Sequence, residues 1–574
     1  MSFPMEQTEE THSFFEIKKE LSLRLEACLP LKQEEILPLL ERPKRPEHGH
    51  LALPVFSVSK KHQTNPRILA EKWAEQVNLK DLQIVEKTEA LFGFINFTFH
   101  GKFLKHQLEN LMVKKELAFF KQASKSHWVM DFASPNVAKH INMGHLRAAV
   151  LGQALVNLAR RFGYRITAVN HLGDWGTQFG KLIWAYQRWG KEYDPTALDS
   201  LVNLYIRFHE EAAKDPEKNR KAAALFKNLE TGDPELTKLW ESFVQISLKD
   251  YDRYWEMLNI KHDLVLGESF YRNLTEDIQK RLKNKNLLKK SDGAQVVFLG
   301  DNHPPCLIQK SDGASTYAAR DLASAIYRFE KLKADKNIYI TGSDQKLHFH
   351  QIFQTLEKLN PKWSPSCKHI AFGMYRFKGG GKMSSRQGQS VFLKDVLDQA
   401  KKRVEKIIES RQSELKDKDQ IAKQVSIGAV VFNDLQQDCA KDVEFNWDRV
   451  LDFEGRTGPF VQYTHVRCLS LMEKYKQPIQ NNFSKNFSFE EDEKTLTWHL
   501  LCFEWAVFQA FQLFKPHILA NYLLNLAAEF NRFYATHRIL DSDRAADRMV
   551  LVYGVQRVLN TGLQILNVPL PSKM

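Results

Sequence analysis

The sequence lacks any apolar run approaching the ~20 residues that a helix needs to cross a bilayer, so no membrane-spanning segment is predicted. Its opening stretch, MSFPMEQTEETHSFFEIKKE, is acidic and has no basic segment followed by an apolar one, which argues against a secretory signal. Cysteine is scarce, and its six residues are scattered: Cys28, Cys306, Cys367, Cys439, Cys468 and Cys502. This spacing supports neither a disulfide framework nor a cysteine zinc site, and it fits a reduced, cytoplasmic location.

Positive charge, by contrast, is in excess. The 82 lysine and arginine residues outnumber the 69 acidic residues, which gives a formal net charge of +13 and a pI near 9.1. Neutralising phosphates and releasing their counterions drives nucleic-acid binding, so this excess favours a polyanionic partner. Many basic proteins bind no nucleic acid, and charge alone leaves the partner open.

Length and composition indicate a multidomain protein. The 574 residues predict roughly three to five domains, and a hydrophobic content of 43% is enough for several cores. We divide the chain into a small α/β domain at 1–118, a Rossmann-type parallel-sheet domain at 119–395 and an α-helical bundle at 396–574. A charged, helical insertion is expected at about 188–262. The predicted fold class is therefore multidomain α/β plus all-α.

Hydrophobic periodicity supports the two outer domains. In the first, residues 14–40 and 65–77 have helical spacing, and FGFINFTFH at 92–100 alternates like a strand. The third domain has helical periodicity almost throughout. Its aromatic run at 498–514 is at helical spacing and predicts bundle core instead of a base-stacking platform.

The middle block begins with a strand, a turn, a helix and a second strand. HWVMDFAS at 127–134 is a short apolar run that stops at a Ser-Pro-Asn turn, and the helical segment 144–163 ends at a glycine. YRITAVNHLGD at 164–174 is the next strand and loop, and KNIYITGS at 336–343 resumes the pattern. This βαβ order is typical of a nucleotide-binding parallel sheet.

Two segments of this block suit phosphate chemistry. In SPNVAKHINMGHLR at 134–147, Gly144 and His145 open a helix, whose N–H groups and dipole favour an anion. Gly144 permits close approach of a ligand to the backbone, and His145 can donate to phosphate oxygens. In GGGKMSSRQG at 379–388, a glycine-rich loop carries Lys382, whose ammonium could move onto a leaving pyrophosphate. Each segment alone could equally be a surface loop.

Together the two segments resemble the paired HIGH and KMSKS signatures of class I aminoacyl-tRNA synthetases. The sequence around them resembles arginyl-tRNA synthetases in particular. The segments that resemble this family include NHLGDWGTQFGKLI at 170–183, GESFY at 267–271 and STYAARDLASAIYR at 315–328. Segments 46–71 and 92–97 resemble the tRNA-contacting N-terminal domain of that family. Segments 443–467 and 548–574 resemble its helical anticodon-binding domain, so the resemblance covers nearly the whole chain.

The resemblance assigns roles to individual residues. Around ATP it places His145, Lys139, Lys382 and Asn142 as catalytic residues, with Gly144, Met383 and Ser384 as further ATP contacts. Around the substrate arginine it places Asn136, Glu268, Tyr317, Asp321 and Gln345. A planar, always charged guanidinium needs carboxylates and oriented acceptors, and Tyr317 and Asp321 share one helix face. From the residues alone, Asp321 could equally be a surface acid paired with Arg320 or Arg328.

Two positions depart from the signatures. Asn142 stands where the first histidine of HIGH is usual, and it could donate a hydrogen bond to ATP or merely cap the helix. Ser385 replaces the second lysine of KMSKS. The resemblance implies that Lys139 compensates for that lost charge.

The implied reaction is arginine–tRNA ligation. ATP is a substrate, Mg²⁺ is expected to bridge its phosphates, and no protein-bound zinc is expected because His348 and His350 have no partner ligands at zinc spacing. The expected partners are L-arginine and tRNA(Arg), without a membrane, and we expect a monomer. Alternatives are a class I synthetase for another amino acid and a non-catalytic RNA-binding paralogue. Trp175 could stack on substrate or pack the turn.

Overall fold

The structure is a computed structural model of the chain. It describes residues 13–574 except for the following positions: 44, 62, 79–81, 119, 121–125, 301–302, 378–391, 411–416 and 453–454. The chain forms two compact units, one made of 1–123, 452–565 and 570–574 and the other of 124–451 and 566–569. The three domain boundaries drawn from the sequence stay a prediction.

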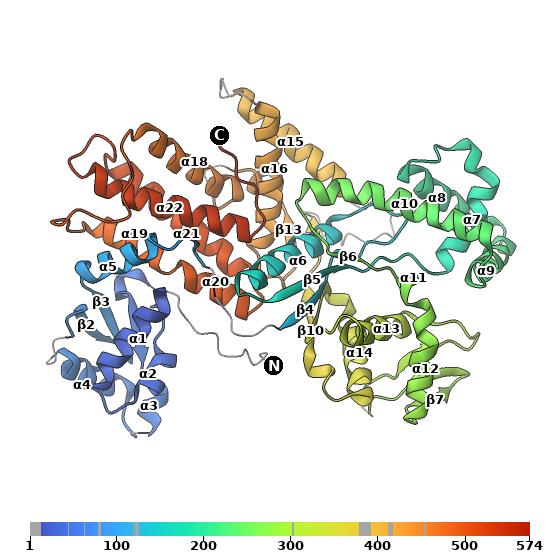
Figure 1. Ribbon diagram of the computed structural model, residues 1–574, viewed down its shortest axis with the longest axis horizontal. Helices are drawn as coiled ribbons and strands as arrows, with labels where there is room; N and C mark the ends of the chain where they lie inside the picture. The colour runs from blue at the N-terminus through green and yellow to red at the C-terminus, as the bar shows by residue number, and fades with distance from the viewer. Residues whose placement is uncertain are drawn as a thin grey trace. The chain divides into compact units, whose positions relative to one another are not determined.

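A parallel sheet organises the second unit (Figure 1). Its strand order is β11-β10-β4-β5-β6, with bounds Cys367–Phe372, Lys336–Gly342, His127–Asp131, Arg165–Asn170 and Leu264–Val265. All four strand pairs are parallel. The chain fills one side of β4 first and then returns to its other side with β10, so the strand order reverses between β4 and β10. Ligands of such sheets bind at this switch point, beyond the carboxyl ends of the strands.

Helices packed on the sheet follow the expected βαβ connections. Helix α6 (Met143–Arg161) joins β4 to β5, and it buries Leu146, Val150 and most of its other side chains. Helices α13 (Tyr317–Glu330) and α14 (Lys346–Leu359) flank β10 and share one apolar core that includes Leu322, Phe349 and Leu356. The strand, helix and turn positions predicted for 127–174 are therefore confirmed.

The helical interruption consists of α7 (Thr177–Trp189), α8 (Leu198–Lys214), α9 (Glu217–Glu230) and α10 (Pro234–Met257). Its helices are amphipathic, with charged outer faces and buried aromatic side chains such as Phe208, Phe226 and Phe243. The segment predicted as an insertion at about 188–262 contains α8, α9 and α10, and α7 before it packs against α9.

The rest of this unit contains structure that the periodicity did not indicate. Helices α11 (Glu268–Tyr271) and α12 (Thr275–Asn284) precede an antiparallel sheet of β7 (Leu288–Ser291), β8 (Ala294–Val297) and β9 (Cys306–Gln309). Strand β12 (Tyr375–Phe377) pairs in parallel with β13 (Val443–Phe445). The remaining helices are α15 (Leu393–Ser410), α16 (Lys418–Leu435) and α17 (Trp447–Val450).

The first unit joins a small α/β part to a helical part. The α/β part contains α1 (Ser13–Glu26), α2 (Gln33–Leu39), α3 (Phe56–Lys61), α4 (Pro66–Asn78) and α5 (Gly101–Met112). Its antiparallel sheet has the order β1-β3-β2, with bounds Leu51–Pro54, Phe94–Phe99 and Val85–Leu91. The amphipathic stretch 14–40 is two helices, because Pro30 lies in the connecting turn and has no N–H to continue a helix.

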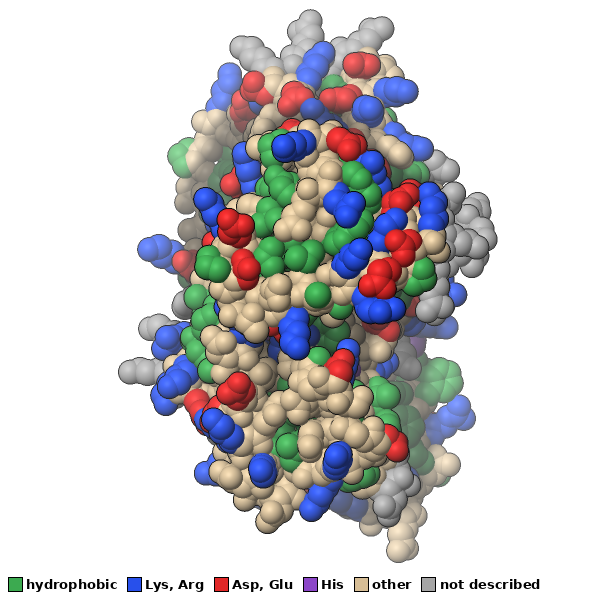
Figure 2. Space-filling model, turned by 90° about the vertical axis from the view of Figure 1, so that its right-hand side faces the viewer, with side chains coloured by type: hydrophobic (Ala, Val, Ile, Leu, Met, Phe, Trp, Pro, Cys, Tyr) green, Lys and Arg blue, Asp and Glu red, His purple; other side chains and the backbone are tan. Residues whose placement is uncertain are grey.

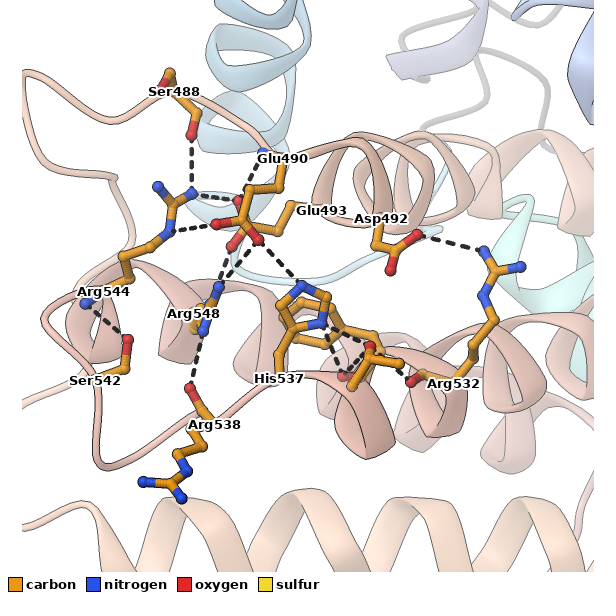
Figure 3. Close-up of polar contacts among 12 residues, drawn as sticks. Ser488, Glu490, Asp492, Glu493, Arg532, His537, Arg538, Ser542, Arg544 and Arg548 are labelled. Atoms are coloured by element: carbon orange, nitrogen blue, oxygen red, sulfur yellow. Dashed lines mark hydrogen bonds and ion pairs between the residues drawn. The ribbon is translucent and has the colours of Figure 1, made fainter.

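The helical part contains α18 (Gly458–Lys474), α19 (Glu491–Leu501), α20 (Phe503–Gln512), α21 (His517–Thr536) and α22 (Ala545–Ile565). Trp498, Phe503 and Phe511 are buried, which confirms the aromatic run as bundle core. Arginines from the start of α22 and from the segment before it surround two glutamates at the start of α19 (Figure 3). Within the described residues, no helix is both long and apolar enough to span a membrane.

Candidate active site

The predicted site segments meet at the carboxyl edge of the parallel sheet. Residues 134–145 follow β4, residues 171–175 follow β5, Glu268 follows β6, and Gln345 follows β10. Helix α13, which carries Tyr317 and Asp321, leads into β10. The parallel topology therefore gathers segments that are far apart in the sequence around one switch point.

The segment after β4 is held in an unusual backbone conformation. Ala133, Ser134 and Ala138 have positive φ angles of 75°, 45° and 60°. Such angles are costly for residues other than glycine and persist only where surrounding contacts impose them. Two residues of helix α10, Tyr251 and Ser247, supply three of those contacts. The Tyr251 hydroxyl lies 2.7 Å from the carbonyl oxygens of both Asn136 and Lys139, and the Ala138 N–H donates to Ser247 Oγ at 3.0 Å.

Asn142 caps helix α6. Its Oδ1 accepts from the N–H groups of Gly144 and His145 at 3.0 and 3.2 Å. In return, the Asn142 N–H donates to His145 Nδ1 at 3.1 Å, which places the imidazole proton of the neutral ring on Nε2. Burial, with the charge of Lys139 adding to it, lowers the pKa of His145 to about 4. His145 is therefore a neutral donor at physiological pH.

The other predicted ATP contacts are only partly described. Lys139 is exposed, and Gly144 lies in the first turn of α6. A glycine here leaves the amide end of the helix open to a ligand. Lys382, Met383 and Ser384 lie outside the described residues.

Two close approaches shape the loop after β5. A Cβ on Gly173 would lie 2.0 Å from Asn136 Oδ1, and one on Gly267 would lie 2.1 Å from Asp174 Oδ2, so a side chain at either position would displace Asn136 or Asp174. Asp174 in turn accepts from the N–H and the hydroxyl of Ser269, at 2.8 and 2.6 Å. Burial raises the pKa of Asp174, and these hydrogen bonds oppose the rise. The glycines and Asp174 together position the turn that carries Glu268.

Glu268 is bonded to an arginine of the protein itself. Arg320 Nε donates to Glu268 Oε2 at 2.7 Å, and both residues are buried. The Arg320 guanidinium also lies over the ring of Tyr317, with its carbon 4.8 Å from the ring centre. Burial raises the pKa of Glu268 to about 8, with Arg320 opposing the rise and Asp321 and Asp174 adding to it.

Asp321 has histidine neighbours. His348 Nε2 lies 2.6 Å from Asp321 Oδ2, and His171 Nε2 lies 3.7 Å from Oδ1. Burial acts to raise the pKa of Asp321, but the hydrogen bond from His348 and the nearby basic groups lower it below its usual value. An ionised carboxylate that already has oriented neighbours suits a guanidinium ligand.

The alternative in which Asp321 pairs with Arg320 or Arg328 is wrong. Arg320 pairs with Glu268, and Arg328 Nη2 donates to the buried carboxylate of Asp131 at 2.7 Å. Consecutive residues of a helix point in different directions, so Arg320 and Asp321 serve different neighbours.

The remaining predicted arginine contacts lie at the mouth of this region. Tyr317 is 61% exposed, and Asn136 and Gln345 are exposed on the loops after β4 and β10. The structure thus brings Glu268, Tyr317 and Asp321 together. For Asn136 and Gln345 it shows the same sheet edge and no contact with the acidic group.

Several other side chains have a structural explanation. Trp175 is buried, packs edge-on against Trp240 and lies under Arg272, whose guanidinium carbon is 4.6 Å from its ring, which favours turn packing. His350 packs against His303, with ring centres 4.5 Å apart. Among the residues that the structure describes, no group of three or more His, Cys, Asp or Glu side chains could hold a metal ion.

Charge alone does not mark a ligand surface on the face drawn in Figure 2. Lysine and arginine side chains are spread over this face with acidic side chains among them. The net charge of +13 is therefore a property of the whole sequence, and the site is better defined by its geometry.

A parallel sheet with a capped helix start and an acidic group at its switch point fits the catalytic domain of a class I tRNA synthetase. Residues 107–447 match the family of class I tRNA synthetases (R), catalytic domain. Residues 461–574 match the DALR anticodon binding domain, and residues 16–99 match the arginyl tRNA synthetase N terminal domain.

Whole-chain relatives agree with these matches. The chain is 39% identical over 557 residues to arginine–tRNA ligase 2 of Bacillus anthracis, covering 95% of this chain and 97% of the relative. It is 38% identical to arginine–tRNA ligase of Halothermothrix orenii, with the same coverage. This chain belongs to the arginyl-tRNA synthetase family. The solved arginyl-tRNA synthetase of Thermus thermophilus shares the fold, with a TM-score of 0.81 at 24% identity over 98% of this chain and 100% of that one.

Proposed function

We propose that the protein is an arginine–tRNA ligase. It activates L-arginine with ATP to arginyl-adenylate, releases pyrophosphate, and transfers the arginyl group to the 3′ end of tRNA(Arg) with release of AMP. The observation that carries this proposal is identity of 38–39% to arginine–tRNA ligases over 95% of the chain. The ionised Asp321 beside Glu268 at the switch point adds a pocket suited to a guanidinium.

ATP binds at the start of α6 in this proposal. The helix N-terminus presents N–H groups to the phosphates, and Nε2 of the neutral His145 donates to one of their oxygens. Lys139 adds a positive charge from the loop after β4, and Lys382, with Met383 and Ser384, approaches from a segment outside the described residues. The arginine carboxylate then attacks the α-phosphorus in line, and the protein contributes positioning and charge stabilisation.

Arginine binds with its guanidinium toward the acidic group. Asp321 and Glu268 accept from its N–H groups, the Tyr317 ring and Gln345 complete the pocket, and Asn136 meets the α-amino group. Asp321 is the stronger acceptor, because it is ionised and bonded to histidine, whereas Glu268 already accepts from Arg320. Asn142 serves the site through the geometry of the α6 cap and can offer its amide N–H groups to ATP.

The remaining partners are part of the same proposal. Mg²⁺ bound with ATP would neutralise charge on the phosphates. The N-terminal α/β part and the C-terminal helices contact tRNA(Arg). The protein acts in the cytoplasm as a monomer, and arginine activation requires bound tRNA.

The test is ATP–pyrophosphate exchange with each proteinogenic amino acid, with and without tRNA. Exchange is expected with arginine alone and only when tRNA is present. Strong exchange with lysine or methionine would reject the amino-acid assignment. Exchange without tRNA would reject the coupling and leave the assignment in place. Absence of exchange with every amino acid, in a protein that still binds tRNA, would favour the non-catalytic paralogue.

A further inference from the structure

Arg320 has the surroundings expected of the substrate. Its guanidinium is held by Glu268 and lies over Tyr317, two of the groups assigned to substrate arginine. Two outcomes are possible for such a residue: it competes with the substrate and must leave, or it stays and prepares the pocket. The contacts of Arg320 decide between them.

Those contacts hold Arg320 in place. Besides the 2.7 Å bond from Nε to Glu268, its Nη1 donates to Ser315 Oγ at 3.1 Å, and the side chain is 7% exposed. Moving it would cost two hydrogen bonds and the contact with the Tyr317 ring. A long side chain held at both sides of its guanidinium has little freedom left to lose on ligand binding.

The bond to Arg320 also determines which part of Glu268 a ligand can use. Arg320 donates to Oε2 through Nε, and carboxylate oxygens each have further acceptor capacity. Fixing Oε2 therefore fixes the direction of Oε1. In a substrate pocket, fixed acceptors discriminate better than mobile ones, because less entropy is lost when the ligand binds.

We propose that Arg320 is a positioning residue for arginine recognition: it stays in place when substrate binds, holds Glu268 by Oε2, and so presents Oε1 to the substrate guanidinium. This inference rests on the proposed function. It adds Arg320 as the residue that orients Glu268, so that Glu268 can accept hydrogen bonds from the substrate beside Asp321.

The charged groups around Glu268 explain why a positioning cation is needed. Arg320 and Asp321 face it from α13 and Asp174 from the loop after β5, with the Tyr317 hydroxyl nearby; His348 of α14 and His171 adjoin Asp321. Two neighbouring carboxylates and burial disfavour the charged form of Glu268, and Arg320 is the group that favours it. Without Arg320, the pKa of Glu268 would rise further.

The experiment compares Arg320→Gln and Arg320→Lys with the wild-type protein by tRNA-dependent exchange across a pH series. We expect Arg320→Gln to raise the KM for arginine roughly 30-fold or more near neutral pH, with the KM for ATP changed by less than about twofold. The pH at which kcat/KM for arginine rises should move upward, because Glu268 ionises later. Arg320→Lys keeps the charge and should restore much of both properties. Arg281→Gln, on α12 with a 37% exposed side chain, is the matched control.

Several results would overturn the proposal. A lower KM for arginine in Arg320→Gln would mean that Arg320 competes with the substrate. An unchanged KM for arginine and an unchanged pH profile would mean that Arg320 has only a packing role. If Arg320→Gln does not fold, Ser315→Ala removes one anchor of Arg320 and must raise the KM for arginine about threefold or more. Absence of arginine exchange in the wild-type protein would instead reject the proposed function.

Discussion

Glu493 of the helical part and Glu268 of the candidate site are both buried acids near basic side chains, yet their surroundings differ. Glu493 is fully buried. It accepts hydrogen bonds from Arg548 Nε, at 3.0 Å, and from Arg544 Nη2 (Figure 3). Glu490 accepts from Arg548 and His537 at 3.1 and 3.0 Å. In this cluster every acid has an arginine partner.

The carboxylates of the candidate site have fewer arginine partners. Glu268 has one arginine, and Asp321 has histidine partners among the described residues. In the proposed site, a substrate guanidinium would therefore meet Asp321 without displacing an arginine of the protein. Under the proposed function, burial of an acid does not distinguish the structural cluster from the arginine site, whereas the type of basic side chain beside the acid does.

Asp321→Asn should have the largest effect on ligand binding. Removing the charge should cost about 2–5 kcal/mol of arginine binding, because a desolvated guanidinium loses its ionised partner. Equilibrium titration with arginine measures this, and the melting temperature should change little. Asp277→Asn, whose side chain is 54% exposed, is the control. Unaltered affinity for arginine in Asp321→Asn would place the pocket elsewhere.

Glu493→Gln should show the opposite pattern. Arg548 and Arg544 would lose their buried carboxylate, and we expect the free energy of unfolding to fall by about 3 kcal/mol. The KM for arginine should stay within about twofold of wild type. Chemical denaturation checks the first value, and Glu491→Gln, on the same helix with an 89% exposed side chain, is its control. A stable variant would mean that the cluster contributes little to the fold.

Variants of Asn142 test whether one residue has both a structural role, as the cap of α6, and a role in the activation of arginine. Asn142→Ala removes the cap of α6 and should lower stability by about 0.5–2 kcal/mol. Asn142→Asp keeps the cap oxygen, so stability should persist, but its charge faces the phosphates and activation should slow. Melting temperature and adenylation rate are measured on both variants. Normal rates in both would show that Asn142 is a cap alone.

The pH dependence of arginine recognition should show the smallest effect. With a raised pKa of about 8, Glu268 is largely protonated near neutral pH and becomes charged above it. The folded state then binds a proton more tightly than the unfolded state, so Glu268 contributes less stability as pH rises toward 8. Arginine recognition should instead improve as pH rises, because Glu268 becomes charged. We expect kcat/KM for arginine to rise up to about tenfold between about pH 7 and pH 9. A profile that is the same in Glu268→Gln would contradict this.

Local patterns in the sequence predict most of the sheet and the capped helix. The apolar run at 127–134, the helix before Gly163 and the strand at 336–343 are each defined by their own residues. The β7–β9 sheet is missed because its strands are short, half exposed and lack a strong alternation.

The site is predicted less completely, since its contacts join residues distant in sequence. Tyr251 and Ser247 hold the segment after β4 from more than a hundred residues away, and no local pattern marks them. The Glu268–Arg320 pair is likewise 52 residues apart. The spacing of His348 and His350 is that of metal ligands, but the partner of His348 is Asp321, which lies 27 residues away in the sequence.

Comparison of L-arginine with L-citrulline tests the central claim most directly. Citrulline has nearly the shape of arginine, with a neutral urea in place of the guanidinium. Equilibrium binding of each to the wild-type protein, with tRNA present, separates charge from shape. If Asp321 and Glu268 form the pocket, citrulline should bind roughly 100-fold more weakly or worse, because it leaves an ionised, partly buried carboxylate without its guanidinium partner. Equal affinities would contradict the account.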